Sequence, residues 1–181
     1  MRHFFAIIFV GLLTLISICG SSMPAGAIAD PLPLVFPSSQ MATLPGIQGV
    51  FAGDPPDHLG LHDGLLAPCP DSPNCVVSQT TDVDHHIDPI PYHTSLEQAR
   101  DTLLTVLTVV PRTKVIEQTE NYIRVESSSN LMGFVDDGEF YFPSDESVIQ
   151  VRFAARLGES DLGVNRRRVE QIRLAMQDLQ A

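Results

Sequence analysis

The C-terminal half of the sequence carries closely spaced acidic and basic side chains, which are residue types that pair with each other, bind ions or transfer protons. The acidic residues come first along the chain, and arginines follow on the next predicted strand and at the start of the last predicted helix. Arginine recognises carboxylates and other anions through a planar fork of N–H donors. The candidate ligand-binding residues are Asp136, Asp137, Glu139, Arg152, Arg156, Asp161, Asn165, Arg166 and Arg168.

Three consecutive arginines, Arg166–Arg168, stand in the first turn of the last predicted helix, where cations oppose the helix dipole. Other groups must therefore compensate the positive charges of these three arginines. One interpretation is an internal ion-pair network, in which Asp136, Asp137 or Glu159 braces the arginines. Asp161 would then cap the helix. In this interpretation the charged cluster holds the fold together.

The second interpretation is a pocket for an anion or a carboxylate, built from Arg152, Arg156 and Arg166. It predicts a non-catalytic binding or assembly domain that engages a partner protein or an anionic small molecule. For the charged cluster itself we favour the internal ion-pair network; for the domain as a whole we favour the non-catalytic binding or assembly function, with no catalytic residue and no cofactor assigned.

The alternative is an enzyme, a hydrolase or lyase that uses Asp136, Asp137 or Glu139 for acid or base chemistry while arginines stabilise charge. No histidine, serine nucleophile or metal motif accompanies these carboxylates in the sequence. A concave pocket around them would favour the enzyme, whereas a sheet face filled by internal salt bridges would favour the binding domain.

A second polar cluster spans Asp82–Asp88 and includes His85 and His86. Histidine and carboxylate side chains bind zinc or copper, so a metal-binding protein is the third interpretation. The residues show no defined ligand spacing, and we therefore assign no metal site. The outcome depends on whether the histidines converge in space.

Cys69 and Cys75 enclose a Pro-rich loop, and five residues separate them. This spacing differs from the two intervening residues of thioredoxin-type and zinc-knuckle motifs. An even number of cysteines in an exported chain favours a disulfide. We therefore predict that Cys69 and Cys75 are bonded and make a surface loop rigid.

Residues 1–29 have the pattern of a signal peptide. Arg2 precedes the apolar run Phe4–Ile18, and the small residues Ala27 and Ala29 form a cleavage site. The run is shorter than the roughly 20 residues of a spanning helix. We predict cleavage and export to the periplasm, a thylakoid lumen or the medium, with only transient membrane contact. Lipidation at Cys19 and retention as an anchor are the alternatives.

The net charge of the chain is −11 at pH 7, and cleavage would remove Arg2 but no acidic residue. A chain this acidic is a poor partner for nucleic acid or anionic lipid. Twelve of the 14 prolines lie at or before Pro91. We interpret 30–61 as a Pro-rich flexible linker and 62–181 as a single domain.

Regular periodicity begins after Pro91. Ser95 and Gln98 form a capping-box signature before a helical pattern that ends at Pro111. Strand patterns at 114–118, 122–127, 134–135, 139–142 and 148–156 follow. An apolar stripe of Leu162, Val169, Ile172, Met176 and Leu179 predicts a helix at about 162–179. We predict an α+β two-layer sandwich, with an antiparallel sheet of about four strands and both helices on one face. The helices would cover the face of Ile123, Val125, Ile149, Val151 and Phe153. The other face would carry Arg124, Glu126, Glu139, Tyr141 and Arg152.

Three separated segments, Leu66–Gln79, Gly133–Phe140 and Arg156–Arg168, resemble the domain of unknown function 1499 family, in the same order along the chain. The family occurs in bacteria, including cyanobacteria, and in plastids, and the resemblance implies no particular activity. The family pattern usually has serine where this chain has Val77, a bulky aliphatic residue at Gly138, and serine at Ala155.

Overall fold

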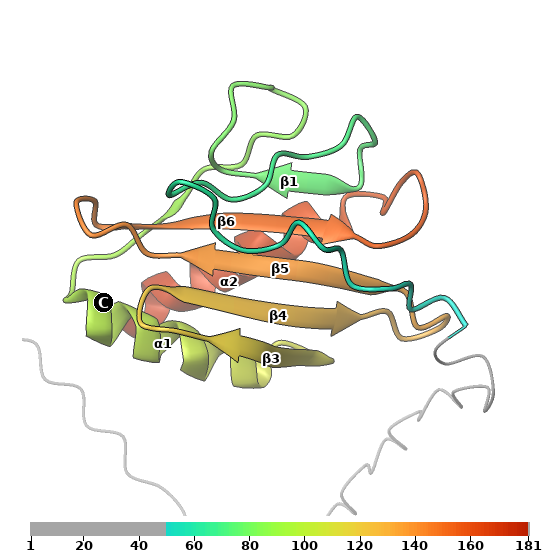
Figure 1. Ribbon diagram of the computed structural model, residues 1–181. Helices are drawn as coiled ribbons and strands as arrows, with labels where there is room; N and C mark the ends of the chain where they lie inside the picture. Colours follow the sequence, from blue (N-terminus) through green and yellow to red (C-terminus); the bar gives the residue numbers. More distant parts are fainter. Residues whose placement is uncertain (1–49, 181) are drawn as a thin grey trace, which may run out of the picture. The chain divides into compact units, whose positions relative to one another are not determined.

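The computed structural model describes residues 50–180 (Figure 1). The predicted signal peptide and most of the predicted linker lie outside the described residues. No helix within 50–180 is both long enough and apolar enough to span a membrane.

Six strands and two helices make an α+β domain. The chain forms β1 (Cys75–Val77), β2 (Ile90–Pro91), α1 (Leu96–Val109), β3 (Thr113–Gln118), β4 (Tyr122–Ser128), β5 (Val135–Tyr141), β6 (Val148–Ala155) and α2 (Val164–Gln180). The strands pair antiparallel in the order β1-β6-β5-β4-β3, and β2 also pairs with β6. The α+β class is therefore confirmed, but the estimate of about four strands was too low.

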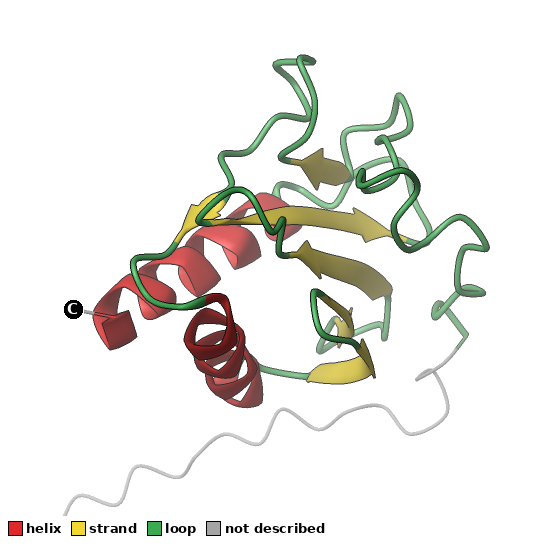
Figure 2. Ribbon diagram, turned by 60° about the vertical axis from the view of Figure 1, so that its left-hand side comes forward, coloured by secondary structure: helices red, strands yellow, loops and turns green. Residues whose placement is uncertain are grey.

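Both helices cover the same face of the sheet (Figure 2). The capping box predicted at the start of α1 is present, since the Ser95 side chain accepts from the Gln98 amide and the Gln98 side chain accepts from the Ser95 amide. Apolar side chains from α1, α2 and alternate positions of β4, β5 and β6 make the core. Its fully buried members include Leu103, Ile123, Phe140, Val151, Phe153 and Met176.

Helix α2 begins two residues later than predicted. Leu162 has a positive φ of 54° and is 84% exposed, so it belongs to the turn before the helix and not to the apolar stripe. Leu179, also assigned to that stripe, is 58% exposed. Val169, Ile172 and Met176 are the positions that face the core.

The separate strand patterns at 134–135 and 139–142 suggested that the acidic segment 136–138 interrupts a strand. In the structure this segment lies within β5. Tyr122, Glu126, Asp137 and Glu139 project from the sheet away from the helices, because alternate residues of a strand point to opposite faces. We call this side the outer face.

The chain between residue 50 and β1 passes in front of the outer face (Figure 1). Leu66 of this segment packs with Val77 and Tyr122 in a small second apolar cluster. Gly53 and Gly60, which fall within the predicted linker, form hydrogen bonds with side chains of the sheet. The outer face is thus partly covered by the chain itself.

Candidate functional site

Asp137 is held by arginines of the outer face. Arg156 donates from Nε to Asp137 Oδ2 at 2.7 Å and from Nη2 to Oδ1 at 2.8 Å, which is a bidentate pair. Arg156 also donates to Glu126 and to the carbonyl of Gly53, and Arg124 Nη1 lies 3.8 Å from Asp137. The hydrogen bonds to Asp137 are the main reason why the pKa of Arg156 is raised. The donors of Arg156 are therefore engaged within the protein.

A second buried pair lies beside the first. Glu139 is fully buried, and its Oε1 accepts from the Tyr122 hydroxyl at 2.8 Å and from the Gly60 amide at 2.7 Å. Arg152 Nη1 donates to Glu139 Oε2 at 3.2 Å. Burial, followed by the charge of Glu139, raises the pKa of Tyr122. Tyr122 therefore stays a hydrogen-bond donor at neutral pH.

Arg152 is 2% exposed, and its Nε is buried without a hydrogen-bond partner among residues 50–180. A buried donor without an acceptor costs about 1–3 kcal/mol. Arg152 differs in this respect from Arg156, whose Nε is bonded to Asp137. Among the described residues of the outer face, Arg152 is the arginine with a buried donor that lacks a partner.

A cavity of about 680 Å³ opens between the outer face and the segment that crosses it. Asp137, Arg152 and Arg156 contribute polar groups from β5 and from β6 and its end. The crossing segment contributes mainly apolar residues and two histidines, namely Pro56, His58, His62, Leu65, Leu66, Ala67, Pro68 and Pro70. The volume lies within the range of small-molecule sites.

Asp136 lies on the opposite side of the sheet from Asp137, under α2. Arg168 Nη1 donates to Asp136 Oδ2 at 2.8 Å and to Asn165 Oδ1 at 2.7 Å. Burial raises the pKa of Asp136 above its usual value, although Arg168 opposes the shift. Asn165 is also buried and donates to the carbonyl of Asn74. These three side chains join α2 to the sheet and to the start of β1.

Asp161, just before α2, and Arg166, in its first turn, also form hydrogen bonds within the protein. Asp161 accepts from the amides of Gly163 and Asn165 at 2.9 and 2.7 Å, so its predicted capping role is confirmed. Arg166 donates to the carbonyls of His86 and Asp84 at 2.6 and 3.0 Å. Arg166 therefore does not join Arg152 and Arg156, and the three-arginine pocket is not assembled as predicted.

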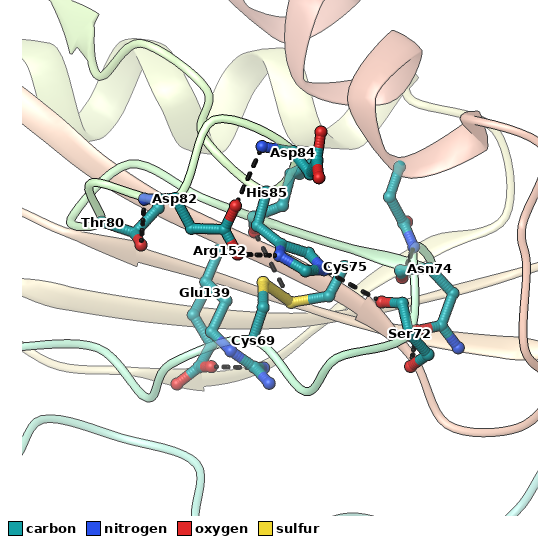
Figure 3. Close-up of a disulfide and its surroundings, with 12 residues drawn as sticks. Cys69, Ser72, Asn74, Cys75, Thr80, Asp82, Asp84, His85, Glu139 and Arg152 are labelled. Atoms are coloured by element: carbon teal, nitrogen blue, oxygen red, sulfur yellow. Dashed lines mark hydrogen bonds and ion pairs between the residues drawn. A yellow bond between two sulfur atoms is a disulfide. The ribbon is translucent and has the colours of Figure 1, made fainter.

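Cys69 and Cys75 form the predicted disulfide (Figure 3). Disulfides persist in oxidising compartments, so the bond is compatible with export, which stays a prediction. Among residues 50–180, no three His, Cys, Asp or Glu side chains are placed to hold a metal ion. Within this range, His85 and His86 do not form a metal-binding group with His58 and His62.

His85 fastens the disulfide loop to the segment that follows β1 (Figure 3). Its Nδ1 lies 2.7 Å from Asp82 Oδ2 and its Nε2 lies 3.1 Å from the carbonyl of Ser72. Both partners are acceptors, so both ring nitrogens donate only when the imidazole is protonated. The hydrogen bond with Asp82 is the main cause of the raised pKa of His85.

We expect the stabilisation by His85 to depend on pH. Because the folded pKa is raised, the contribution is complete below the unfolded pKa of about 6.5 and is lost as the pH rises through the folded pKa. Thermal unfolding of wild type and His85→Gln from pH 5 to 9 should give a difference in Tm that is largest at the acidic end. His93→Gln, at an exposed position, is the control. A difference that does not change with pH would contradict the protonated assignment.

Sequence reasoning did not reveal the roles of four residues at the outer face. Alternation along β4 places Tyr122 on this face, but its bond to Glu139 depends on register. Gly60 contributes only its backbone amide. His58 and His62 line the cavity, and nothing in their spacing indicates it.

The fold and the site together define a class of protein: a small α+β domain with two helices on one sheet face and, on the other, buried ion pairs under a disulfide-stabilised segment. The family model described as "Protein of unknown function (DUF1499)" matches residues 65–176, and the chain belongs to this family. Neither the curated proteins nor the solved structures include a match to this chain.

Proposed function

We propose that this domain is a non-catalytic binding domain whose outer-face cavity takes a small molecule with an anionic group. The observation that carries the proposal is Arg152, which lines the cavity, is 2% exposed and has an Nε donor without a partner among the described residues. Nε itself is buried, so an acceptor oxygen of a bound molecule would reach it once the Arg152 side chain turns toward the cavity, and charge-assisted hydrogen bonds of this kind are strong.

Arg152 is the less compensated of the two arginines that line the cavity. Arg156 is paired with both Asp137 and Glu126, whereas Arg152 is paired with Glu139 alone. Glu139 lies behind Arg152 and partly neutralises it, but Glu139 receives only the donor at Nη1. The ligand's anionic group would therefore share Arg152 with Glu139.

The cavity is lined by Asp137, as the enzyme alternative expects, but the hydrogen bonds of the carboxylates favour binding over catalysis. Asp137 accepts two hydrogen bonds from Arg156, and Glu139 accepts from Arg152, Tyr122 and Gly60. Every oxygen of these two carboxylates therefore already accepts a hydrogen bond from the protein. Asp136, the third carboxylate of the enzyme alternative, lies on the other face of the sheet.

The binding test compares Glu139→Gln with the double variant Glu139→Gln/Arg152→Gln. Both keep an amide oxygen at position 139 for Tyr122 and Gly60, but only the single variant keeps the guanidinium. Arginine Nε–H signals are followed by NMR while acetate, hexanoate or inorganic phosphate is added. In wild type, at least one of these anions should shift the Arg152 signal. Glu139→Gln should bind that anion more tightly than wild type, and the double variant should bind it about tenfold or more weakly.

Arg100→Gln is the matched control, because Arg100 lies on α1 and donates to the carbonyl of Thr119. It should bind the anions like wild type. The proposal fails if none of the three anions moves the Arg152 signal, or if the folded double variant binds as tightly as wild type.

A further inference from the structure

The cavity has two unlike sides, and this bears on what the anionic ligand is. Arg152, Ala154 and Arg156 alternate along and just beyond β6, so the sheet side presents two guanidinium groups separated by a methyl group. The crossing segment faces them with Leu65, Leu66, Ala67, Pro68 and Pro70. A ligand in this space meets charge on one side and apolar surface on the other.

Only one of the two arginines has an unused buried donor. The Nε and Nη2 donors of Arg156 are bonded to Asp137 and Glu126, and its Nη1 donates to the carbonyl of Gly53. A second negative charge on the ligand would therefore lie near Asp137 without a free arginine to balance it. This arrangement favours a single negative charge over a polyanion such as phosphate.

The apolar side of the cavity is held in place by a disulfide and by a hydrogen bond from a backbone amide. Cys69, which lies between two of the lining prolines, is bonded to Cys75 of β1. The amide of Leu66 donates to Gln79 Oε1 at 2.9 Å. Leu65 is 54% exposed, although it lines the cavity. The wall is therefore fixed before a ligand arrives, and it includes an apolar side chain that a ligand would shield from water.

We propose that the ligand is an amphipathic monocarboxylate, with its carboxylate on Arg152 and its alkyl or aryl body against Leu65, Leu66 and the neighbouring prolines. The planar carboxylate matches the guanidinium fork. The apolar body replaces water along the crossing segment. This inference rests on the proposed function, since it specifies the chemical class of the molecule that the same site binds.

The test is a chain-length series at pH 7, with acetate, butanoate, hexanoate and octanoate titrated into the folded domain below their aggregation concentrations. Each added methylene that enters the cavity should tighten binding about fourfold. Hexylammonium and 1-hexanol should bind at least tenfold more weakly than hexanoate, and inorganic phosphate should also bind more weakly. Leu65→Ser should reduce the gain per methylene, whereas Leu174→Ser, at a similarly exposed position on α2, should not.

Equal affinity for all four carboxylates, or tighter binding of phosphate than of hexanoate, would overturn the monocarboxylate inference. If the Arg152 Nε–H signal still responds to these anions, the anion-binding proposal survives. If no anion moves that signal, both fail together.

Discussion

Replacing Glu139 with alanine is expected to lower the free energy of unfolding by about 3–5 kcal/mol, because it leaves the charge of Arg152 buried without its partner. Glu139 is fully buried, and Arg152 is 2% exposed. The substitution also removes the acceptor of the Tyr122 hydroxyl and of the Gly60 amide, which fastens the crossing segment to the sheet. Urea denaturation at pH 7, followed by circular dichroism, measures the loss.

The control is a double variant, Glu139→Leu/Arg152→Met, which removes both charges. It should recover most of the lost stability, because replacing a buried ion pair by apolar side chains of similar volume is often neutral. Glu120→Ala, in the exposed turn between β3 and β4, should change the stability by less than about 0.5 kcal/mol. A folded Glu139→Ala within 1 kcal/mol of wild type would show that the pair does not brace the sheet.

Local patterns account for the parts of the fold that the sequence predicts well. The capping box at Ser95 and Gln98 located the start of α1, and Pro111 located its end. Alternation along β4 and β6 assigned Ile123, Val125 and Ile149 to the core face. These features depend on neighbours within a few residues, so a single sequence contains them.

The additional strands were missed because they are short and depend on distant partners. β1 has three residues and β2 has two, and both become strands by pairing with β6, about 60 to 80 residues later. Neither is long enough to show a period of two. The segment that covers the outer face is held partly by backbone groups, the amide of Gly60 and the carbonyl of Gly53, which leave no side-chain pattern.

The candidate site was predicted as one cluster, and the structure divides it into three places. Asp136 and Asp137 are adjacent in sequence, but the pleat sends them to opposite faces, one to Arg168 and the other to Arg156. Arg166 points to the loop carbonyls of His86 and Asp84. Sequence proximity thus indicated which charged residues take part in ion pairs and hydrogen bonds. Their individual partners are set by the strand register and by the direction in which each residue of α2 points.

Gly138 lies directly against a large aromatic side chain of the neighbouring strand. A Cβ atom built at Gly138 would lie 2.2 Å from Cζ of Phe153 and 2.7 Å from Cγ2 of Val125. Phe153 is directly opposite Gly138 in the β5–β6 register and contacts Phe140 edge to face. The Phe153 ring therefore occupies the space that a side chain at position 138 would need.

We expect Gly138→Val to lower the free energy of unfolding by about 3 kcal/mol or more, because the buried ring and the neighbouring backbone must move. Phe153→Val alone should cost somewhat less than the about 3–5 kcal/mol of a buried Phe→Ala substitution, because valine fills part of the cavity that the ring leaves. The double variant Gly138→Val/Phe153→Val should be more stable than either single variant, since one side chain fills the space that the other vacates. Gln118→Val, on the exposed edge strand β3, controls for adding a β-branched residue. Urea denaturation of the four variants and of wild type measures these losses in the free energy of unfolding. If the losses of the two single variants simply add in the double variant, the Phe153 ring does not fill the space of a side chain at position 138.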